Sequence, residues 1–412
     1  MKRHTSIRNI LTQIALVLGA AVLVLQILDI YNPLMGFVSG GYYRTLLALL
    51  CVSAVAGGIW SLAAGGKTAP ADGPRARPWA AAALDLVLAL AFVGGWFGVR
   101  VLSDVLHPAE PVTVSELAPP SPPAAETAAT PAPAPEATPE ATPDPRTEWQ
   151  IRFAEHFTED VVITEDSYSS PNLSVTVTRH EMGEGRDKLT WYLADIYMGS
   201  IDCFRSELAR TPPTFRCSAT FQELAERSDA VVAVNGDYIA YSYGGVAVRN
   251  GVVWSDRPST VDMCLLYRDG VMECVHPKEF DMDAAAARDV WQVWSFGPGL
   301  LGPDGALEPI PPSSIPNIHM TGKNPRTAIG YFEPGHYCFV VADGRQPGYS
   351  RGARLEELSQ IFHDLGCKAA FNLDGGGSSM MSFRGETVTH SYNRVPRRLS
   401  DIVLIADAPP EG

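Results

Sequence analysis

The fold is decided by a stretch near the C-terminus, LEELSQIFHDLGCKAAFNLDGGGSS, which spans residues 355–379. Its first part is predicted to be a helix, because its apolar residues recur at helical spacing on one face. These residues are Leu355, Leu358, Ile361, Phe362 and Leu365. Gly366 suits the left-handed position that ends such a helix. The run Lys368–Asp374 that follows predicts a strand.

A second strand, Tyr337–Ala342, comes before this helix and runs up to Asp343. Two strands with a helix between them bring their ends to the same edge of a sheet if they are parallel. Asp343 and Asp374 would then lie at one edge. The sequence therefore predicts a functional site at the ends of these two strands.

The last eight residues of the stretch, Asn372–Ser379, carry the most distinctive chemistry. Three consecutive glycines at a strand end let the backbone approach a ligand closely. The amides of Gly375, Gly376 and Gly377, with the Ser378 hydroxyl, are predicted to bind an anion, and Asp374 adds a carboxylate at the rim. The structural alternative is a tight turn with an Asp cap. The segment lacks the lysine of a P-loop and the spaced glycines of GxSxG, so a serine nucleophile is not expected.

Other segments repeat this combination of strand, glycine and charge. Asn235-Gly236-Asp237 follows the apolar run Val231–Val234, and Gly344-Arg345 follows Asp343. Arg326 precedes a predicted strand, Ala328–Phe332, and Arg397 lies late in the chain. Guanidinium groups bind phosphate through two hydrogen bonds. These arginines therefore predict a phosphate-binding site, with ordinary turns and a solvated basic loop as the alternatives.

Metal ligands are weakly indicated. The histidines show no metal-ligand spacing, so no transition metal is expected. The carboxylates of Asp237, Asp343 and Asp374 leave a hard cation such as calcium as an alternative. No other cofactor is predicted.

Residues 148–412 have the pattern of a compact, strand-rich α+β domain. Ser174–His180 and Trp191–Met198 are predicted strands. Asn250-Gly251 and Asp269-Gly270 each predict a hairpin turn within an apolar run. A capping box, Thr220–Glu223, predicts the start of a helix over Phe221–Arg227.

The chain has seven cysteines, and all but Cys51 lie after residue 200. Six cysteines in one domain favour disulfides and an oxidising compartment, although a reduced domain with buried thiols is the alternative. If the loop at 268–270 closes a hairpin, Cys264 lies opposite Cys274, close enough to bridge. That disulfide is favoured, and Cys203–Cys217 comes next. Cys338–Cys367 is the remaining pair, and neither of these two rests on geometry.

The N-terminal third predicts a membrane anchor. Three apolar segments are long enough to span a bilayer, which takes about 20 residues. They are Ile10–Ile30, Leu46–Ala64 and Trp79–Leu102. Basic residues at 2–8 and 67–77 are expected on the cytoplasmic side. Residues 1–106 are thus predicted to be a membrane domain with three helices, and everything after them to lie outside the cytoplasm.

Residues 107–147 are rich in Pro, Ala and Thr and predict an extended linker. Nearly all of the net charge of −14 lies beyond them. An acidic domain repels a phosphate backbone at long range, so no nucleic-acid partner is expected. A local group of arginines can still bind a phosphate-bearing substrate.

Four segments, taken in order, resemble the phosphodiester glycosidase domain family over roughly Asp195 to Ala406. They are Asn235-Gly236-Asp237, Pro325-Arg326-Thr327-Ala328, Asp343-Gly344-Arg345 and Asn372–Ser379. The resemblance implies a mixed α/β domain that hydrolyses a sugar-1-phosphate diester. It also implies that the site is lined by Asp237, Arg326, Asp343, Arg345, Asn372, Asp374 and the following glycines. The N-terminal spans differ from the C-terminal anchor of the family's best-known member, which favours a bacterial cell-surface relative.

The sequence therefore predicts a cell-surface enzyme acting on a phosphate-containing glycan, with Asp374 as base or nucleophile. Its partner carboxylate is expected to be Asp343 or Asp237. The substrate-binding residues are expected to be Asn235, Arg326, Arg345, Asn372, Gly375, Gly376, Gly377, Ser378 and Arg397. Two alternatives remain: a non-catalytic module that binds an anionic cell-wall or capsular glycan, and an accessory component of exopolysaccharide assembly.

Overall fold

The computed structural model describes residues 112–117, 144–210, 218–238, 245–311, 321–393 and 397–407. All of them belong to one compact unit, Ala109–Gly412. The predicted spans Ile10–Ile30, Leu46–Ala64 and Trp79–Leu102 lie outside the described residues. Within the described residues, no helix is both long enough and apolar enough to cross a membrane.

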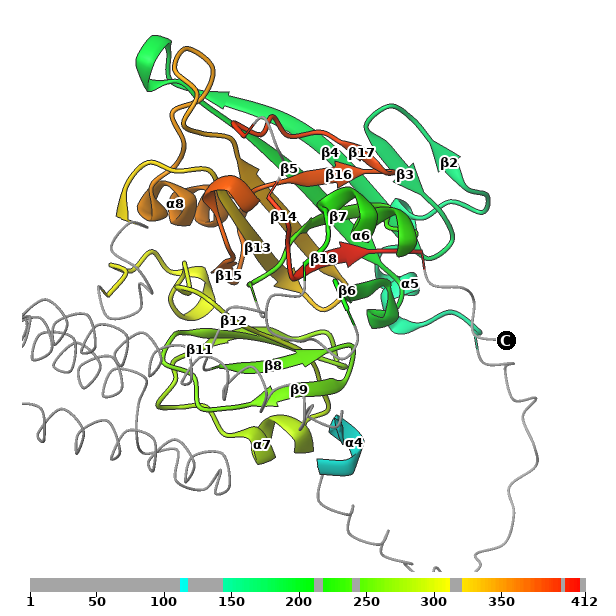
Figure 1. Ribbon diagram of the computed structural model, residues 1–412. Coiled ribbons are helices and arrows are strands. Elements are labelled where there is room, and N and C mark those ends of the chain that lie inside the picture. The colour runs from blue at the N-terminus through cyan, green and yellow to red at the C-terminus, as the bar shows by residue number, and fades with distance from the viewer. Residues whose placement is uncertain are drawn as a thin grey trace, which may run out of the picture. The chain divides into compact units, whose positions relative to one another are not determined.

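The described strands form three antiparallel sheets (Figure 1). The largest has seven strands, in the order β15-β13-β14-β5-β4-β3-β2. These are β2 (Val162–Ile163), β3 (Ser167–Ser169), β4 (Leu173–Met182), β5 (Leu189–Met198), β13 (Arg326–Glu333), β14 (His336–Ala342) and β15 (Ala369–Asn372). The predicted strands Ser174–His180 and Trp191–Met198 are confirmed as parts of β4 and β5.

The edge of this sheet at the ends of β14 and β15 carries the residues predicted to form the site. β13 pairs antiparallel with both strands, so β14 and β15 run parallel to each other on either side of it. Asp343 and Asp374 therefore follow strands that end at the same edge. Arg326, the first residue of β13, lies opposite Ala342 at that edge. The predicted strand–helix–strand arrangement is confirmed, with β13 inserted between its two strands.

The second sheet has five strands, in the order β17-β16-β7-β18-β6. They are β6 (Phe204–Leu208), β7 (Val232–Asn235), β16 (Met381–Phe383), β17 (Glu386–Thr387) and β18 (Asp401–Ile405). β7 lies in the middle and is buried along its whole length, as its apolar sequence requires. Asn235, its last residue, lies opposite Ile402 of β18.

The third sheet has six strands, in the order β1-β9-β8-β12-β10-β11. They are β1 (Val112–Thr113), β8 (Val246–Arg249), β9 (Val252–Asp256), β10 (Met263–Tyr267), β11 (Met272–Val275) and β12 (Val290–Ser295). Both predicted hairpins are present. Asn250 and Gly251 have φ of 53° and 72°, the left-handed pair that a tight two-residue hairpin turn requires.

In the part of the chain that the structure describes, the α-helices are few and short, which confirms the strand-rich α+β class of this domain. They are α4 (Val114–Leu117), α5 (Glu148–Arg152), α6 (Phe221–Arg227), α7 (Met282–Ala287) and α8 (Leu355–Leu365). α6 begins at the predicted capping box. α8 ends at Gly366 with φ of 87°, because a residue without Cβ adopts the left-handed conformation at little cost.

One hydrophobic core joins the three sheets. Phe204 of β6 packs edge-on against Phe339 of β14, with ring centroids 5.7 Å apart. It also lies 5.8 Å from Trp294 of β12, and all three side chains are fully buried. α8 covers the other face of the seven-stranded sheet, where Phe362 packs with Val340 and Ala370. The sheet edge that carries the site is therefore supported on both faces.

Residues 112–117 differ from the expectation of an extended linker over 107–147. Val112 and Thr113 pair with β9, and Val114 is buried against the third sheet. Val112, Thr113 and Val114 carry no charge, and they lie beside the edge strand β9, which offers them backbone partners. The linker residues 118–143 lie outside the described residues.

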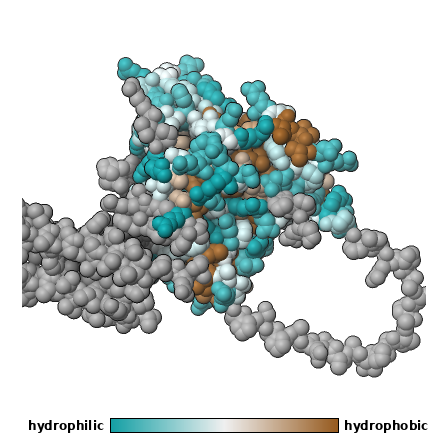
Figure 2. Space-filling model, turned by 45° about the vertical axis from the view of Figure 1, so that its right-hand side comes forward, coloured by the Kyte–Doolittle hydropathy of each residue, from teal (hydrophilic) through white to brown (hydrophobic). Residues whose placement is uncertain are grey.

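The surface of the domain is mostly hydrophilic in the view of Figure 2. The large apolar side chains that stay exposed include Val161, Val162 and Ile163 at the edge strand β2.

Of the described cysteines, Cys264, Cys274, Cys338 and Cys367 are free thiols. Cys264 does lie opposite Cys274, as predicted, and the sulfurs of Cys338 and Cys367 are 3.7 Å apart. A disulfide needs about 2.05 Å, so the predicted Cys264–Cys274 and Cys338–Cys367 bonds are wrong for this structure. Strand register sets the spacing of two backbones but not the rotamers or oxidation state of the thiols. Cys217 lies outside the described residues.

Candidate active site

A cleft with a volume of about 240 Å³ opens at this sheet edge. It is lined by Phe296, Asn324, Pro325, Arg326, Arg345, Asp374, Gly375, Gly376, Gly377, Tyr392, Asn393 and Arg397. Seven of the predicted site residues are thus brought together from four separate segments. Among the described residues, three arginines and one aspartate line the cleft, which makes this lining locally cationic in an acidic chain.

Asp374 follows β15 and its side chain is only 15% exposed. Its Oδ1 accepts from the Gly375 amide at 2.9 Å, and its Oδ2 accepts from the Ser378 hydroxyl at 2.6 Å. Burial raises the pKa of this carboxyl, opposed by the Ser378 hydrogen bond and by the positive charge of Arg397. Arg397 lies 3.8 Å from Oδ2. Asp374 is therefore a largely buried carboxylate held in one orientation, as a base or nucleophile requires.

Arg326 is buried at the start of β13. Its Nε donates to the Ala353 carbonyl at 3.2 Å, and a terminal nitrogen donates to the Gly322 carbonyl at 2.9 Å. Burial lowers its pKa to about 10, with the nearby charge of Arg345 acting in the same direction. At neutral pH the group is still charged. A guanidinium that is buried among carbonyl groups and lines a cleft is stabilised when an anionic ligand binds.

Arg345 reaches the cleft from the turn after β14. Its backbone has φ of 59°, and its guanidinium donates to Asn324 Oδ1 at 2.7 Å and to the Tyr392 hydroxyl at 2.5 Å. Arg397 is less constrained, since its side chain is 41% exposed and lies over the ring of Tyr238 at 5.1 Å. The three arginines therefore present one buried, one fixed and one partly exposed cation.

The glycine segment is shaped by close packing. A Cβ on Gly375 would lie 2.9 Å from the Pro325 carbonyl oxygen, and one on Gly377 would lie 2.4 Å from Asn393 Nδ2. The predicted anion nest is only partly available. The Gly375 amide donates to Asp374, and the Gly376 amide donates to the Pro325 carbonyl at 2.9 Å. Among the described residues, only the Gly377 amide of the three has no internal acceptor.

Three predicted substrate-binding residues support the cleft from behind and do not line it. Ser378 holds the Asp374 carboxylate. Asn235 is fully buried, and its Nδ2 donates to the Asp374 carbonyl at 2.7 Å. Asn372 is also buried and donates to the Gly297 carbonyl at 2.9 Å, next to Phe296 of the lining. A polar side chain at a strand end is as well suited to bonding a neighbouring loop as to bonding a ligand.

Asp343 lies outside the cleft lining. Both of its carboxylate oxygens accept from the His390 amide, at 3.1 and 3.0 Å, and Oδ2 accepts from the Tyr349 hydroxyl at 2.9 Å. Burial raises its pKa to about 6. Asp343 thus anchors the segment that leads to Tyr392 and Asn393, two residues of the cleft.

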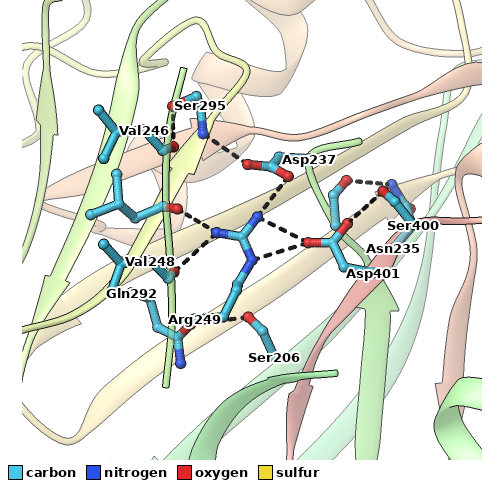
Figure 3. Close-up of polar contacts among 12 residues, drawn as sticks. Ser206, Asn235, Asp237, Val246, Val248, Arg249, Gln292, Ser295, Ser400 and Asp401 are labelled. Carbon is cyan, nitrogen blue, oxygen red and sulfur yellow. Dashed lines mark hydrogen bonds and ion pairs between the residues drawn. The ribbon is translucent and has the colours of Figure 1, made fainter. Parts of the chain in front are cut away.

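Asp237 is also outside the lining and is 1% exposed. One oxygen accepts from Arg249 at 2.7 Å and the other from the Ser295 amide at 2.8 Å, as Figure 3 shows. Burial, together with the nearby charge of Asp401, raises the pKa of Asp237 to about 6 against the effect of Arg249. The predicted calcium site would need the three aspartates to converge, and they do not. The described residues contain no group of three His, Cys, Asp or Glu side chains that could hold a metal ion.

Five residues of the lining were not among the site residues predicted from the sequence: Phe296, Asn324, Pro325, Tyr392 and Asn393. Asn324 precedes Pro325-Arg326, so its position was a usable signal. Phe296 follows the end of β12 and resembles any core aromatic in sequence. Tyr392 and Asn393 come from a loop without a periodic pattern, and only tertiary contacts bring Tyr392 to Arg345 and Asn393 to Gly377.

Comparison with known proteins agrees with the motifs. Residues 228–406 match the family model described as phosphodiester glycosidase. This part of the chain, which holds every residue of the cleft, belongs to the phosphodiester glycosidase family, as the ordered motifs predicted.

A curated relative is the SPbeta prophage-derived uncharacterized protein YomE of Bacillus subtilis (strain 168). It is 26% identical over 193 residues, which are 45% of this chain and 29% of that protein. The chain therefore spans less than a third of that relative's length.

Two solved structures are also similar. The catalytic domain of zebrafish N-acetylglucosamine-1-phosphodiester alpha-N-acetylglucosaminidase, auto-inhibited by its pro-peptide, has a TM-score of 0.47 and 16% identity, covering 60% of this chain and 88% of that one. A hypothetical protein from Synechocystis has a TM-score of 0.41 and 13% identity, covering 60% and 64% of the two chains.

Proposed function

We propose that this chain hydrolyses a glycosyl phosphodiester, with water replacing the phosphate at the anomeric carbon of the sugar. The observation that carries the proposal is the carboxylate of Asp374, which lines the same cleft as Arg326, Arg345 and Arg397. The family match supports a hydrolase of this class.

The arginines suit the phosphate half of the substrate. Arg345 is held by Asn324 and Tyr392, so binding an anion costs it little side-chain entropy. Arg326 is anchored by backbone carbonyls. Together with the Gly377 amide they would hold the diester and stabilise the charge that grows on the leaving phosphate.

Asp374 suits the sugar half. The bond between the anomeric carbon and the phosphate oxygen breaks, the phosphomonoester leaves with the electron pair, and water supplies the hydroxyl. Acting as base, Asp374 takes the proton of that water; acting as nucleophile, it first forms a glycosyl ester that water then cleaves. A phosphomonoester leaves without a strong acid. That fits a cleft in which, among the described residues, Asp374 is the one carboxylate, while Asp343 and Asp237 have structural contacts instead.

We also propose that the domain works outside the cytoplasm, at the cell surface. The support is the sequence pattern of three N-terminal apolar segments with basic flanks. Reporter fusions after residue 147 test this, and a cytoplasmic reporter signal would contradict it.

The function is tested by incubating the full-length chain, purified in detergent, with N-acetylglucosamine-1-phospho-6-mannose and with glycosylated teichoic-type polymers. Release of free sugar supports the proposal, and NMR of the first product separates the two roles of Asp374. Inversion at the anomeric carbon assigns it as base, and retention assigns it as nucleophile. Tight binding of these ligands without release would instead support a glycan-binding module.

A further inference from the structure

A buried ionic cluster lies directly behind the cleft, and the motifs of the sequence did not reveal it. Arg249 of β8 is 1% exposed, and so are Asp237 and Asp401. The Arg249 guanidinium donates to Asp237 Oδ1 at 2.7 Å and to Asp401 Oδ2 at 3.0 and 3.1 Å. It also donates to the carbonyls of Val248 and Val293 (Figure 3). We call Asp237, Arg249 and Asp401 the buried brace.

The brace is connected to Asp374 through the backbone of two residues. Asn235 and Gly236 lie between them. On the brace side, the Gly236 amide donates to the Asp401 carbonyl at 3.1 Å. On the cleft side, the Asp374 amide donates to the Gly236 carbonyl at 3.3 Å, and Asn235 Nδ2 donates to the Asp374 carbonyl. The two residues thus transmit the position of the brace to the backbone of Asp374.

Steric fit shows how closely this layer is packed. A Cβ on Gly236 would lie 2.4 Å from the carboxylate carbon of Asp401, closer than Cβ atoms come in proteins. The glycine between Asn235 and Asp237 is required by the brace, because any side chain there would displace Asp401.

The charges of the brace do not cancel. Two carboxylates face one guanidinium, so an excess negative charge lies behind the cleft when both are ionised. The charge of Asp401 favours the protonated form of Asp374, while Arg397, the Ser378 hydroxyl and the Gly375 amide favour the ionised form. Removing charge from the brace should therefore change the pKa of Asp374 without replacing any residue that lines the cleft.

We infer that Arg249 is a positioning residue, which with Asp237 and Asp401 fixes the place and the protonation of Asp374. The role rests on the proposed function of Asp374. A purely structural brace would stabilise the fold but would leave the position and the pKa of Asp374 unchanged.

The test uses three variants of the full-length chain. Arg249→Lys keeps the charge but cannot contact both carboxylates at once. Asp401→Asn removes the charge and keeps the shape. The triple variant Asp237→Asn, Arg249→Met, Asp401→Asn removes every charge of the brace. Leu358→Ala, a core substitution in α8 away from the cleft, controls for lost stability.

Two measurements are made on each variant. The first is kcat and KM for the glycosyl phosphodiester that the wild type cleaves. The second needs no activity: it is the titration of the Asp374 carboxyl by ¹³C NMR of aspartate-labelled protein, with the signal assigned by its loss in Asp374→Asn.

A positioning role predicts a fall in kcat on the order of 100-fold for Arg249→Lys, with KM unchanged. It also predicts a lower pKa for Asp374 in Asp401→Asn, and neither change in Leu358→Ala. The inference is overturned if the triple variant melts like the wild type and keeps its kcat and its Asp374 titration. If the wild type releases no sugar, the proposed function fails separately. The titration then decides alone: a shifted pKa in Asp401→Asn supports the inference and an unshifted one refutes it.

Discussion

The Ser378 hydroxyl lies 2.6 Å from Asp374 Oδ2, inside the glycine segment that follows β15. Both residues belong to the segment 355–379, so the candidate catalytic carboxylate and the group that orients it lie within one turn of the chain. The short separation along the chain makes this contact insensitive to movements elsewhere in the domain.

Replacing Ser378 by Ala should raise the pKa of Asp374, because the lost hydrogen bond stabilises the ionised carboxylate. If the ionised form is active, the acid limb of the kcat/KM profile moves to higher pH. The free energy of unfolding should fall by about 2 kcal/mol, as for other hydrogen bonds to charged groups. Ser359→Ala, a buried serine in α8 that bonds the Leu355 carbonyl, is the matched control. An unshifted profile in Ser378→Ala would separate the hydroxyl from catalysis.

Replacing Arg345 by Met should weaken binding of the phosphate while leaving the fold intact, since the hydrogen bonds of this guanidinium to described residues go to Asn324 and Tyr392, two side chains of the cleft. Loss of a charged hydrogen-bonding partner predicts a rise in KM of about 10- to 100-fold. Arg268→Met, which removes an exposed ion pair to Asp202, serves as the control. Steady-state kinetics decide, and an unchanged KM would exclude Arg345 from substrate binding.

Because of Asp343, the free energy of unfolding should depend on pH, and the sign of this dependence follows from its pKa. Its pKa is about 6 in the folded chain, above the ordinary value of 3.8, so the folded state binds the proton more tightly than the unfolded state. Its contribution to stability is therefore lost as pH rises from about 4 to about 6, by on the order of 2 kcal/mol. Asp343→Asn should abolish this part of the slope. Thermal unfolding between pH 4 and 7 measures it, and parallel curves for variant and wild type would refute the assignment.

The parts predicted well from sequence depend on local rules. α8 and β15 follow from apolar spacing and a terminal glycine, and the capping box places α6 to the residue. Asp374 and Arg326 reach the cleft because strand ends meet at one sheet edge. These features need only the nearest residues and the pairing of adjacent strands.

The parts that were missed depend on tertiary contacts. Arg249 stands at the end of a short strand, where a charged residue is usually solvated, and only the carboxylates of distant Asp237 and Asp401 explain its burial. Asp237 was assigned to catalysis because a strand, a glycine and an acid precede both structural and catalytic carboxylates. The Cys264–Cys274 register was correct, yet the bond is absent, since register does not determine thiol chemistry.

The proposed role of Asp374 is tested by comparing Asp374→Asn with the wild type for sugar release from a glycosyl phosphodiester at saturating substrate. Loss of a positioned base predicts a fall in kcat of about 10²- to 10⁴-fold. Binding of inorganic sulfate at the arginines should be kept or strengthened, because the variant removes a negative charge from the cleft. Near-wild-type release by a folded Asp374→Asn protein would contradict the account.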